Sequence, residues 1–507
     1  MPDLVLRCVR QPGESTLSDV QIRDGVITQI VPVGPSPLTS LTTGETPSVA
    51  QVDLDGRTIV PGLWDEHVHM TQWALAGARF DLSAAESARE ALQLVRAQFG
   101  PAARPTPLIG VRFRDAIWAD APTLRGLDEV THGHPTALIS HDLHCVWLNS
   151  AAAARFGVPV DESGLVREQA AFALTIALGQ LPDAEVDALA AQAGTRAAAR
   201  GVVGVVDFEM TWNVDAWQRR IASGFDAVRI DAGIYFADLD RAVAERMRTG
   251  ARLEGSSGLL TVGPLKLLID GSLGTRTAFC VDEYPAGGHG VLTVSEDELV
   301  GILLRAREVG LLPAVHAIGD AANTIALNAF ERAAVEGGAS RASVAGRIEH
   351  AQFLQTGDFA RFARLGVTAS VQPEHALDDR DEVELNWAAG ASRVFALRSL
   401  LDAGATLAFG SDAPVAPLDP WTAMSAASSR ARSDGREPWR PDQVITRSEA
   451  LAASARSRRR LCVGDVADIA ILDGDPLTVS DATFERMPVA ATLLAGRATH
   501  GAALLAG

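Results

Sequence analysis

Residues 61–69 have the sequence Pro-Gly-Leu-Trp-Asp-Glu-His-Val-His, in which a short strand-like run ends in two histidines. Side chains two residues apart in a strand point to the same face. His67 and His69 can therefore face one side of a strand end and bind one metal ion. Alone, the His-X-His pattern is a weak signal, because structural or surface pairs share its spacing.

Strand-like runs recur along the chain and alternate with segments of helical length, which predicts parallel β/α architecture. Their number matches the eight strands that a closed TIM-type barrel requires. The runs begin at Leu63, Val202, Val228, Leu265, Leu312, Arg347, Val367 and Thr406. We therefore expect an α/β fold, a distorted TIM (β/α)8 barrel that includes residues 61–72 and 200–454.

The interval between the first two candidate strands is much longer than a crossover needs. It contains strand-like runs at 108–113 and 136–140 and an alanine-rich helical tract near 183–200. We expect residues 73–199 to form an insertion domain that caps the barrel mouth.

Both ends of the chain have β character. Asp24-Gly25 between apolar runs is a hairpin signal, residues 35–47 have the composition of a loop, and apolar runs recur near the C-terminus. Neither end alone has enough strands to bury a core. Residues 1–60 and 455–507 should therefore pair into one small β-sandwich.

Composition narrows the class of protein. The 507 residues are 47% hydrophobic and 21% charged, which is typical of a globular chain. A net charge of −18 argues against nucleic-acid and anionic-membrane partners. Four cysteines without a Cys-X-X-Cys pair favour a cytoplasmic setting, and no leader or membrane-spanning run is evident. The sequence leaves a homo-oligomer open.

More candidate ligands follow later strands. His316 ends the run 312–315 and His350 ends the run 347–349, each where a strand meets its loop and where active-site residues of such barrels gather. Neutral imidazole is a common zinc ligand, so two such histidines beside His67 and His69 favour a metal site. Asp412 follows the last candidate strand, where a metal, a histidine or a turn would satisfy its carboxylate.

Lys266 lies inside the apolar run 262–269, which predicts a buried strand. Burial of an ammonium group is costly unless it is paired or modified. A desolvated lysine has a lowered pKa and can react with carbon dioxide, and the product would bridge two metal ions. An ion pair with Asp270 or Asp231 is the alternative.

Together these residues resemble the amidohydrolase superfamily, in the order His-X-His, Lys, His, His, Asp. In its detailed sequence the chain resembles the YtcJ-like, N-substituted formamide deformylase-like branch over nearly its whole length. The matching segments are residues 61–69, 144–150, 265–278, 316–320, 349–351, 370–373, 410–415 and 467–472.

This resemblance implies roles for single residues. His67 and His69 would bind a first metal ion, and His316 and His350 a second. Carboxylated Lys266 would bridge the two ions. Asp412 would be both a ligand and a proton shuttle, and His144 resembles a substrate-side histidine supplied by the insert.

Two further residues are candidates for substrate binding. Arg276 could bind an anionic substrate group, since guanidinium forks suit carboxylates, although an ion pair with Asp270 or Asp282 is equally compatible. His375 follows the seventh candidate strand, where substrate contacts are expected.

We expect a metal-dependent hydrolase that cleaves a non-peptide C–N bond of an amide, formamide or cyclic amide in a small molecule. One or two divalent ions, with zinc as the expected metal, would activate hydroxide, and Asp412 would carry the proton to the leaving nitrogen. A one-metal deaminase-type hydrolase and a metal-dependent lyase or isomerase remain alternatives, because a fold does not fix a reaction. A non-enzymatic binding protein would have lost some of the six ligand positions, and none is lost here.

Overall fold

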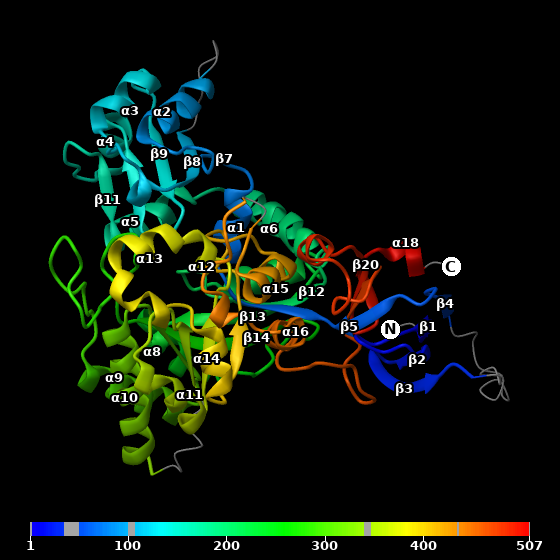
Figure 1. The fold of residues 1–507 in the computed structure, drawn as a ribbon. Coiled ribbons are helices and arrows are strands. Elements are labelled where there is room, and N and C mark those ends of the chain that lie inside the picture. Colours follow the sequence, from blue (N-terminus) through cyan, green and yellow to red (C-terminus); the bar gives the residue numbers. More distant parts are fainter. Residues whose placement is uncertain (1–2, 35–49, 100–106, 339–345, 433–434, 506–507) are drawn as a thin grey trace.

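A computed structural model describes residues 3–34, 50–99, 107–338, 346–432 and 435–505 (Figure 1). The loop expected at 35–47 lies outside these residues. Among the described helices, none is long and apolar enough to cross a membrane.

The central element is an eight-stranded sheet in which every neighbouring pair is parallel. The strands are β6 (Leu63–Val68), β12 (Val202–Asp207), β13 (Arg229–Tyr235), β14 (Leu260–Leu268), β15 (Pro313–Ala317), β16 (Gly346–His350), β17 (Val367–Val371) and β18 (Leu407–Phe409). β18 and β6 are joined by the Asp412 amide, 2.7 Å from the His67 carbonyl oxygen, and the His69 amide, 2.9 Å from that of Ala413. The expected barrel is confirmed and is nearly closed.

One strand differs from its expected start by more than one residue. β14 begins at Leu260 rather than Leu265. In the sequence, Gly263-Pro264 interrupts the run of apolar residues and therefore resembles a strand boundary. In the structure the register of β14 against β13 shifts at this point, and a Cβ on Gly263 would lie 2.6 Å from the Ala232 backbone. The glycine therefore allows the strand to continue through an irregularity.

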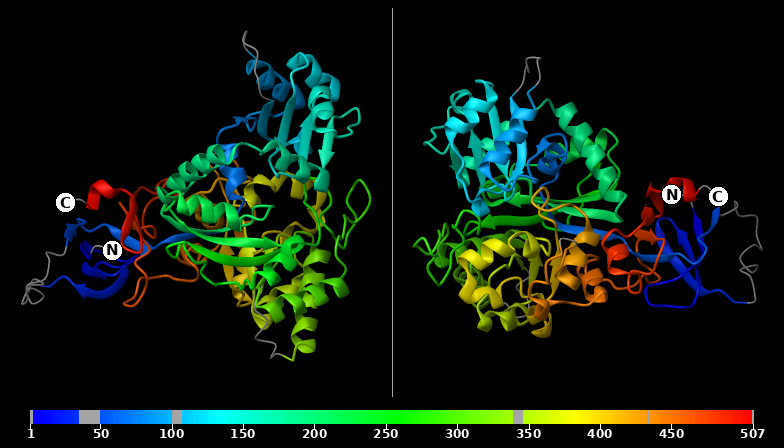
Figure 2. Two further views of the ribbon diagram at one scale, coloured as in Figure 1. Left: turned by 180° about the vertical axis from the view of Figure 1, so that it is seen from behind. Right: turned by 45° about the horizontal axis from the view of Figure 1, so that its top comes forward.

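Helices cover the outside of the barrel (Figures 1 and 2). Alanines of α10 pack with Phe330 against the barrel strands in the largest core. The covering helices are α7 (Val214–Ala222), α8 (Leu239–Ala244), α9 (Glu296–Val309), α10 (Asp320–Glu336), α11 (Phe359–Leu365), α14 (Leu397–Asp402), α15 (Pro420–Ser429) and α16 (Arg447–Ala453). Two short helices, α12 (His375–Asp378) and α13 (Arg380–Asn386), follow β17 instead.

The long interval after β6 forms a separate sheet above the barrel, in the order β11-β10-β9-β8-β7 (Figure 1). Its elements are α1 (Met70–Ala76), β7 (Phe80–Asp81), α2 (Ala88–Ala97), β8 (Leu108–Phe113), α3 (Leu124–Thr131), β9 (Thr136–Ser140), β10 (Cys145–Leu148), α4 (Ser150–Phe156), β11 (Leu165–Arg167), α5 (Glu168–Leu178) and α6 (Asp183–Ala198). Ala193 and Ala197 of α6 share a core with Val202 of the barrel. Because α6 packs with the barrel, this packing does not show where the insert ends. The limits 73–199 for the insert stay a prediction.

Two four-stranded sheets from both chain ends form the expected sandwich. One has the order β3-β2-β1-β4 and the other β21-β20-β19-β5. The strands are β1 (Leu4–Val9), β2 (Ser18–Arg23), β3 (Val26–Pro32), β4 (Ala50–Asp53), β5 (Thr58–Pro61), β19 (Ile469–Leu472), β20 (Val489–Leu494) and β21 (Arg497–His500), with the short helices α17 (Asp481–Glu485) and α18 (Ala502–Leu505) nearby. Leu6 and Ile22 pack with Ile471 and Leu493 in one core. Asp24-Gly25 turns the hairpin with both φ angles positive, 48° and 76°.

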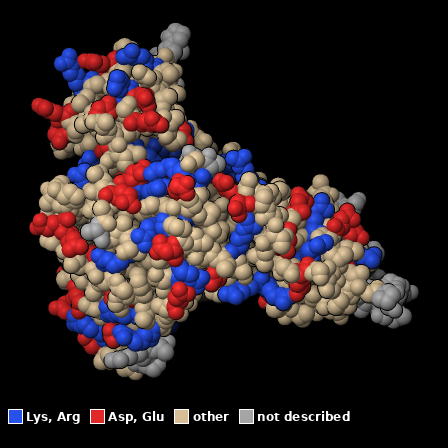
Figure 3. Space-filling model, in the orientation of Figure 1, with Lys and Arg blue, Asp and Glu red and all other residues tan. Residues whose placement is uncertain are grey.

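Charged side chains of both signs are mixed over the face shown in Figure 3. Many charged side chains of the protein form ion pairs, such as Arg332 with Glu296 and Asp297. Exposed pairs of this kind contribute at most about 1 kcal/mol each, so the buried apolar cores supply most of the stability.

We expect Gly410→Ala to destabilise the protein and lower its metal content together. A Cβ at this position would lie 2.6 Å from the His67 amide nitrogen, where β18 meets β6. Overpacking of this kind costs about 1–3 kcal/mol. Denaturant unfolding and metal analysis measure the two effects. In the control Gly301→Ala, the helical Cβ meets nothing within 4 Å, so stability should stay equal or rise.

Candidate metal centre

The expected ligands converge on one cavity at the carboxyl ends of the barrel strands. Its empty space, about 1050 Å³, includes open solvent at the mouth, and the cavity extends under the insert. Its lining includes all six residues proposed as ligands, namely His67, His69, Lys266, His316, His350 and Asp412. His144 and His375 also line it, whereas Arg276 is exposed and is not part of the wall.

The closest group of ligand atoms comes from three different strand ends. His67, His350 and Asp412 each offer one nitrogen or oxygen, and these atoms lie within 4.8 Å of one another. His69 Nε2 lies 3.1 Å from Asp412 Oδ1, and the ring centroids of His316 and His350 are 4.5 Å apart. Side chains that are remote in sequence thus form one compact donor set.

Glu349 fixes the orientation of His67, a role that the sequence did not reveal. Its carboxylate lies 2.7 Å from His67 Nδ1, and both side chains are buried. Burial raises the pKa of Glu349, but Arg347 and His67 outweigh it and hold the pKa well below the usual range. The carboxylate therefore accepts the Nδ1 hydrogen and leaves the Nε2 lone pair free, a common arrangement behind metal-binding histidines.

A chain of ion pairs supports Glu349 from the opposite end of the barrel. Arg347 binds both Glu349 and Glu66, with an Nη1–Oε2 distance of 2.8 Å to Glu66. Arg456 then joins Glu66 to Asp231, at 2.6 Å from each. Two charged residues at alternate positions of a buried strand, Arg347 and Glu349, are the sequence signal that could have indicated this network.

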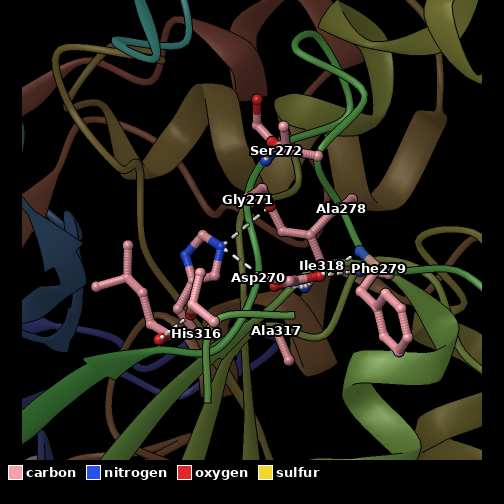
Figure 4. A network of polar contacts seen from close by, with 12 residues as sticks. Asp270, Gly271, Ser272, Ala278, Phe279, His316, Ala317 and Ile318 are labelled. Atoms are coloured by element: carbon pink, nitrogen blue, oxygen red, sulfur yellow. Dashed lines mark hydrogen bonds and ion pairs between the residues drawn. The ribbon is translucent and has the colours of Figure 1, made fainter. Parts of the chain in front are cut away.

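Asp270 and the loop after β14 orient His316 (Figure 4). His316 Nε2 lies 3.3 Å from the Gly271 carbonyl oxygen and 3.5 Å from Asp270 Oδ1. Both partners accept hydrogen bonds, so Nε2 carries the hydrogen and Nδ1 keeps its lone pair. Asp270 is held by the backbone amides of Phe279 and Gly319, at 3.0 and 2.8 Å.

Lys266 is the single lysine of the chain and lies inside the barrel, 2% exposed. Its Nζ lies 3.1 Å from His67 Nε2 and 4.6 Å from the centre of the Phe208 ring. The expected alternative partners are engaged elsewhere, Asp270 with backbone amides and Asp231 with Arg456. Burial lowers the pKa of Lys266 to about 8.

Most of the other ionisable groups of the cluster are in states that suit a cation. His69 differs, because burial lowers its pKa but Asp412 outweighs burial and raises the pKa above the usual value. Burial lowers the pKa of His67 to about 4 and that of His316 to about 3, so both rings are neutral at neutral pH. Burial raises the pKa of Asp412, but His67 and His69 hold it well below the usual range. Nδ1 of His69 and of His350 has no hydrogen-bond partner in the described parts of the chain. The neutral imidazoles of His67 and His316, together with one ionised carboxylate, fit a divalent ion such as zinc.

Glu349→Gln should weaken metal binding by about 10- to 100-fold, the usual effect of removing a carboxylate behind a ligating histidine. The amide cannot draw the Nδ1 hydrogen of His67 as strongly, so Nε2 becomes less basic. Competition with a chelator measures the affinity. Glu331→Gln is the control, because this glutamate pairs with Arg361 on the barrel surface. Equal affinity of wild type and Glu349→Gln would remove Glu349 from the site.

His144 of the insert faces the substrate side of the cavity. Its Nδ1 lies 2.9 Å from Glu168, whose other carboxylate oxygen accepts a 2.6 Å hydrogen bond from Thr277. Burial lowers the pKa of His144, but Glu168 and Asp142 outweigh it and raise the pKa above the usual value. His375 stacks on His350 at 6.3 Å and leaves Nε2 without a partner in the described chain.

The sequence of this chain is similar to those of known amidohydrolases. The amidohydrolase family matches residues 50–500. Protein LONG AFTER FAR-RED 3 of Arabidopsis thaliana is 29% identical (83% of this chain, 79% of the relative). Putative amidohydrolase YtcJ of Bacillus subtilis is 26% identical (90% and 91%), and N-substituted formamide deformylase of Arthrobacter pascens is also 26% identical (89% and 90%).

A solved structure shares the fold. The crystal structure of an uncharacterized metal-dependent hydrolase from Pyrococcus furiosus has a TM-score of 0.71 and 25% identity, covering 94% of this chain and 100% of its own. The YtcJ-like and deformylase-like resemblance seen in the sequence is thus confirmed over most of the chain. The chain belongs to the amidohydrolase family.

Proposed function

We propose that the protein hydrolyses a non-peptide C–N bond of an N-formyl, N-acyl or cyclic amide compound. The observation that carries this proposal is the meeting of His67, His350 and Asp412 beside buried Lys266 at the floor of one cavity. A relative named N-substituted formamide deformylase supports the choice of bond.

Divalent metal, with zinc as the expected ion, would be held by His67, His69, His316, His350 and Asp412, and carboxylated Lys266 would join two ions. Such ions lower the pKa of water and polarise a carbonyl group. The chain's own residues then move the proton. Asp412 is ionised and borders the cavity, so it can accept a proton from water and deliver it to the leaving nitrogen.

The substrate side combines apolar and polar groups. Phe113, Leu143 and Phe172 supply apolar wall, which suits a hydrophobic substituent on the nitrogen or acyl carbon. Glu168 and Asp142 raise the pKa of His144, which favours the protonated ring, and the Nε2 of that ring can donate a hydrogen bond to a substrate oxygen. The insert thus contributes to binding as well as shielding the site from water.

Metal counting together with a compound screen tests the proposal. We expect one or two zinc ions per chain. We also expect release of an amine from N-formyl or N-acyl compounds, or ring opening of cyclic amides, and this activity should be lost after chelation. One ion per chain and ammonia release from amino-heterocycles would favour the deaminase-type alternative. A reaction that incorporates no oxygen from labelled water would identify a lyase or isomerase and contradict hydrolysis.

A further inference from the structure

The turn that connects β9 to β10 forms part of the wall of the large cavity at the barrel mouth, which we call the main cavity. All six residues from Ser140 to Cys145 line it, including His144 on the proposed substrate side. Asp142 Oδ1 accepts hydrogen bonds from the Ser140 hydroxyl at 2.6 Å and from the His144 amide at 3.1 Å, which fixes the shape of the turn. The turn therefore holds its side chains in place before a substrate binds.

Leu143 lies in this turn with a strained backbone. Its φ angle is 65°, in the left-handed region that glycine adopts without steric cost and that a bulky residue rarely adopts. Strain of this kind persists only where the surroundings impose it, and it is concentrated at sites that hold ligands. Because glycine would make the same turn without strain, the turn alone does not explain a leucine at this position. The function of this leucine therefore lies in its side chain.

The Leu143 side chain lies at the boundary of two spaces. It lines the main cavity and also a small space between the barrel and the insert, which has room for about one water molecule. Leu143 is 8% exposed and shares an apolar core with Val415, which also lines the main cavity. The Val415 amide donates to the Asp412 carbonyl oxygen at 2.9 Å. Leu143 thus closes the main cavity on the side where the wall leads away from Asp412 toward the insert.

Other leucines of the same core have a purely structural role and provide a comparison. Leu174 and Leu178 are 3% and 5% exposed, pack in the core that contains Leu143, and line neither of the two spaces. Leu143 differs from both, because its backbone is strained and its side chain meets the main cavity. Core packing alone would therefore not require this residue to face the cavity.

We propose that Leu143 limits the length of the apolar substituent that the main cavity accepts beside the bond that is cleaved. The inference rests on the proposed function and narrows its substrates to N-formyl, N-acyl or cyclic amide compounds that are short on this side. Phe113 and Phe172 line the same cavity, so apolar groups are available to hold a short substituent. A longer one would have to displace Leu143, which the close-packed core and the fixed turn resist.

Straight-chain alkyl hydroxamates of increasing length test the proposal, because the hydroxamate oxygens bind zinc and the alkyl chain then probes the cavity. Calorimetric titration of the zinc-loaded protein measures their affinity. In the wild type, affinity should rise by about fourfold for each buried methylene group and fall once the chain reaches Leu143. In Leu143→Gly the rise should continue for about three further methylene groups, so the ratio of long-chain to short-chain affinity increases by at least about tenfold.

Leu143→Ala is the second variant, because it opens much of the same space while a side chain remains on the strained backbone. It should shift the preferred chain length in the same direction as Leu143→Gly. Leu174→Ala is the matched control. It should lower the melting temperature through the lost core packing, yet show the same dependence on chain length as the wild type. Melting curves also establish that each variant is folded.

The outcomes separate this proposal from the proposed function. The same dependence on chain length in the wild type and in whichever Leu143 variant is folded would overturn the role of Leu143 and leave the proposed function standing. The expected shift in a protein that cleaves no amide would support the role of Leu143 and contradict only the proposed function. Failure of the zinc-loaded protein to bind any hydroxamate would contradict the metal centre and both proposals with it.

Discussion

Asp412→Asn is expected to reduce turnover by about 10²- to 10⁴-fold while metal content stays close to that of the wild type, because general acid–base groups contribute on this scale. Asparagine keeps an oxygen at the position that lies 3.1 Å from His69 Nε2 and 3.5 Å from His67 Nε2. It cannot accept and return a proton. Loss of proton transfer should therefore appear in kcat rather than in metal binding.

The backbone around Asp412 should keep its conformation when asparagine replaces aspartate. Its φ angle of 57° is in the left-handed region, which asparagine tolerates as well as aspartate does. Its amide also bonds the His67 carbonyl oxygen at 2.7 Å, a contact that does not depend on the side chain. The barrel should thus close normally in the variant.

Asp419→Asn is the matched control for this experiment. Asp419 follows the same strand but caps α15 and pairs with Arg200 at 2.9 Å, outside the main cavity. Its replacement should lower stability slightly and leave kcat within about twofold, as expected for a half-buried pair remote from the reaction. Unchanged turnover in Asp412→Asn with full metal content would remove Asp412 from proton transfer.

The barrel could be predicted from the sequence because its strands are buried on both faces. Apolar runs such as 202–206 and 312–315 are the direct consequence of helices on one side and packed side chains on the other. The same logic located the candidate ligands, since polar side chains that end such runs point toward the mouth. His316 and His350 lie as this reasoning expected.

The second layer of the site could not be predicted, because it depends on pairs of residues brought together only by barrel closure. Glu349 and His67 are 282 positions apart, and no local pattern indicates their 2.7 Å contact. Loop residues pose the same difficulty. The side chain of Thr275, which lines the main cavity, donates to Glu168 of the insert, whereas neighbouring Arg276, with a φ of 58°, is exposed to solvent.

Lys266→Ala is expected to lower metal content to one ion or fewer per chain and to reduce turnover by at least about 100-fold, a loss on the scale seen when groups that hold or orient a metal are removed. The reason is that a neutral amine adds carbon dioxide to give a carbamate and a proton. This step converts a buried cation into an anionic oxygen ligand. Alanine cannot form that ligand.

The pH dependence of this modification follows from the lowered pKa of Lys266, about 8 instead of the usual 10.5. Only the unprotonated amine reacts, so its fraction rises about tenfold per pH unit up to pH 8 and levels off above it. Reactivation of metal-depleted protein by zinc and bicarbonate should accordingly speed up from pH 6 to 8 and then reach a plateau. A lysine with its ordinary pKa would keep gaining speed beyond pH 9.

The absence of any other lysine makes the measurement unambiguous. Protein incubated with ¹³C-bicarbonate should show one carbamate resonance besides any from the amino terminus, and Lys266→Ala should lose it. Lys266→Arg is a useful second variant, because guanidinium keeps a positive charge but forms no carbamate at neutral pH. If wild type binds two ions without this resonance, Nζ is not the bridge, and the 3.1 Å contact with His67 Nε2 holds an unmodified amine beside the metal site.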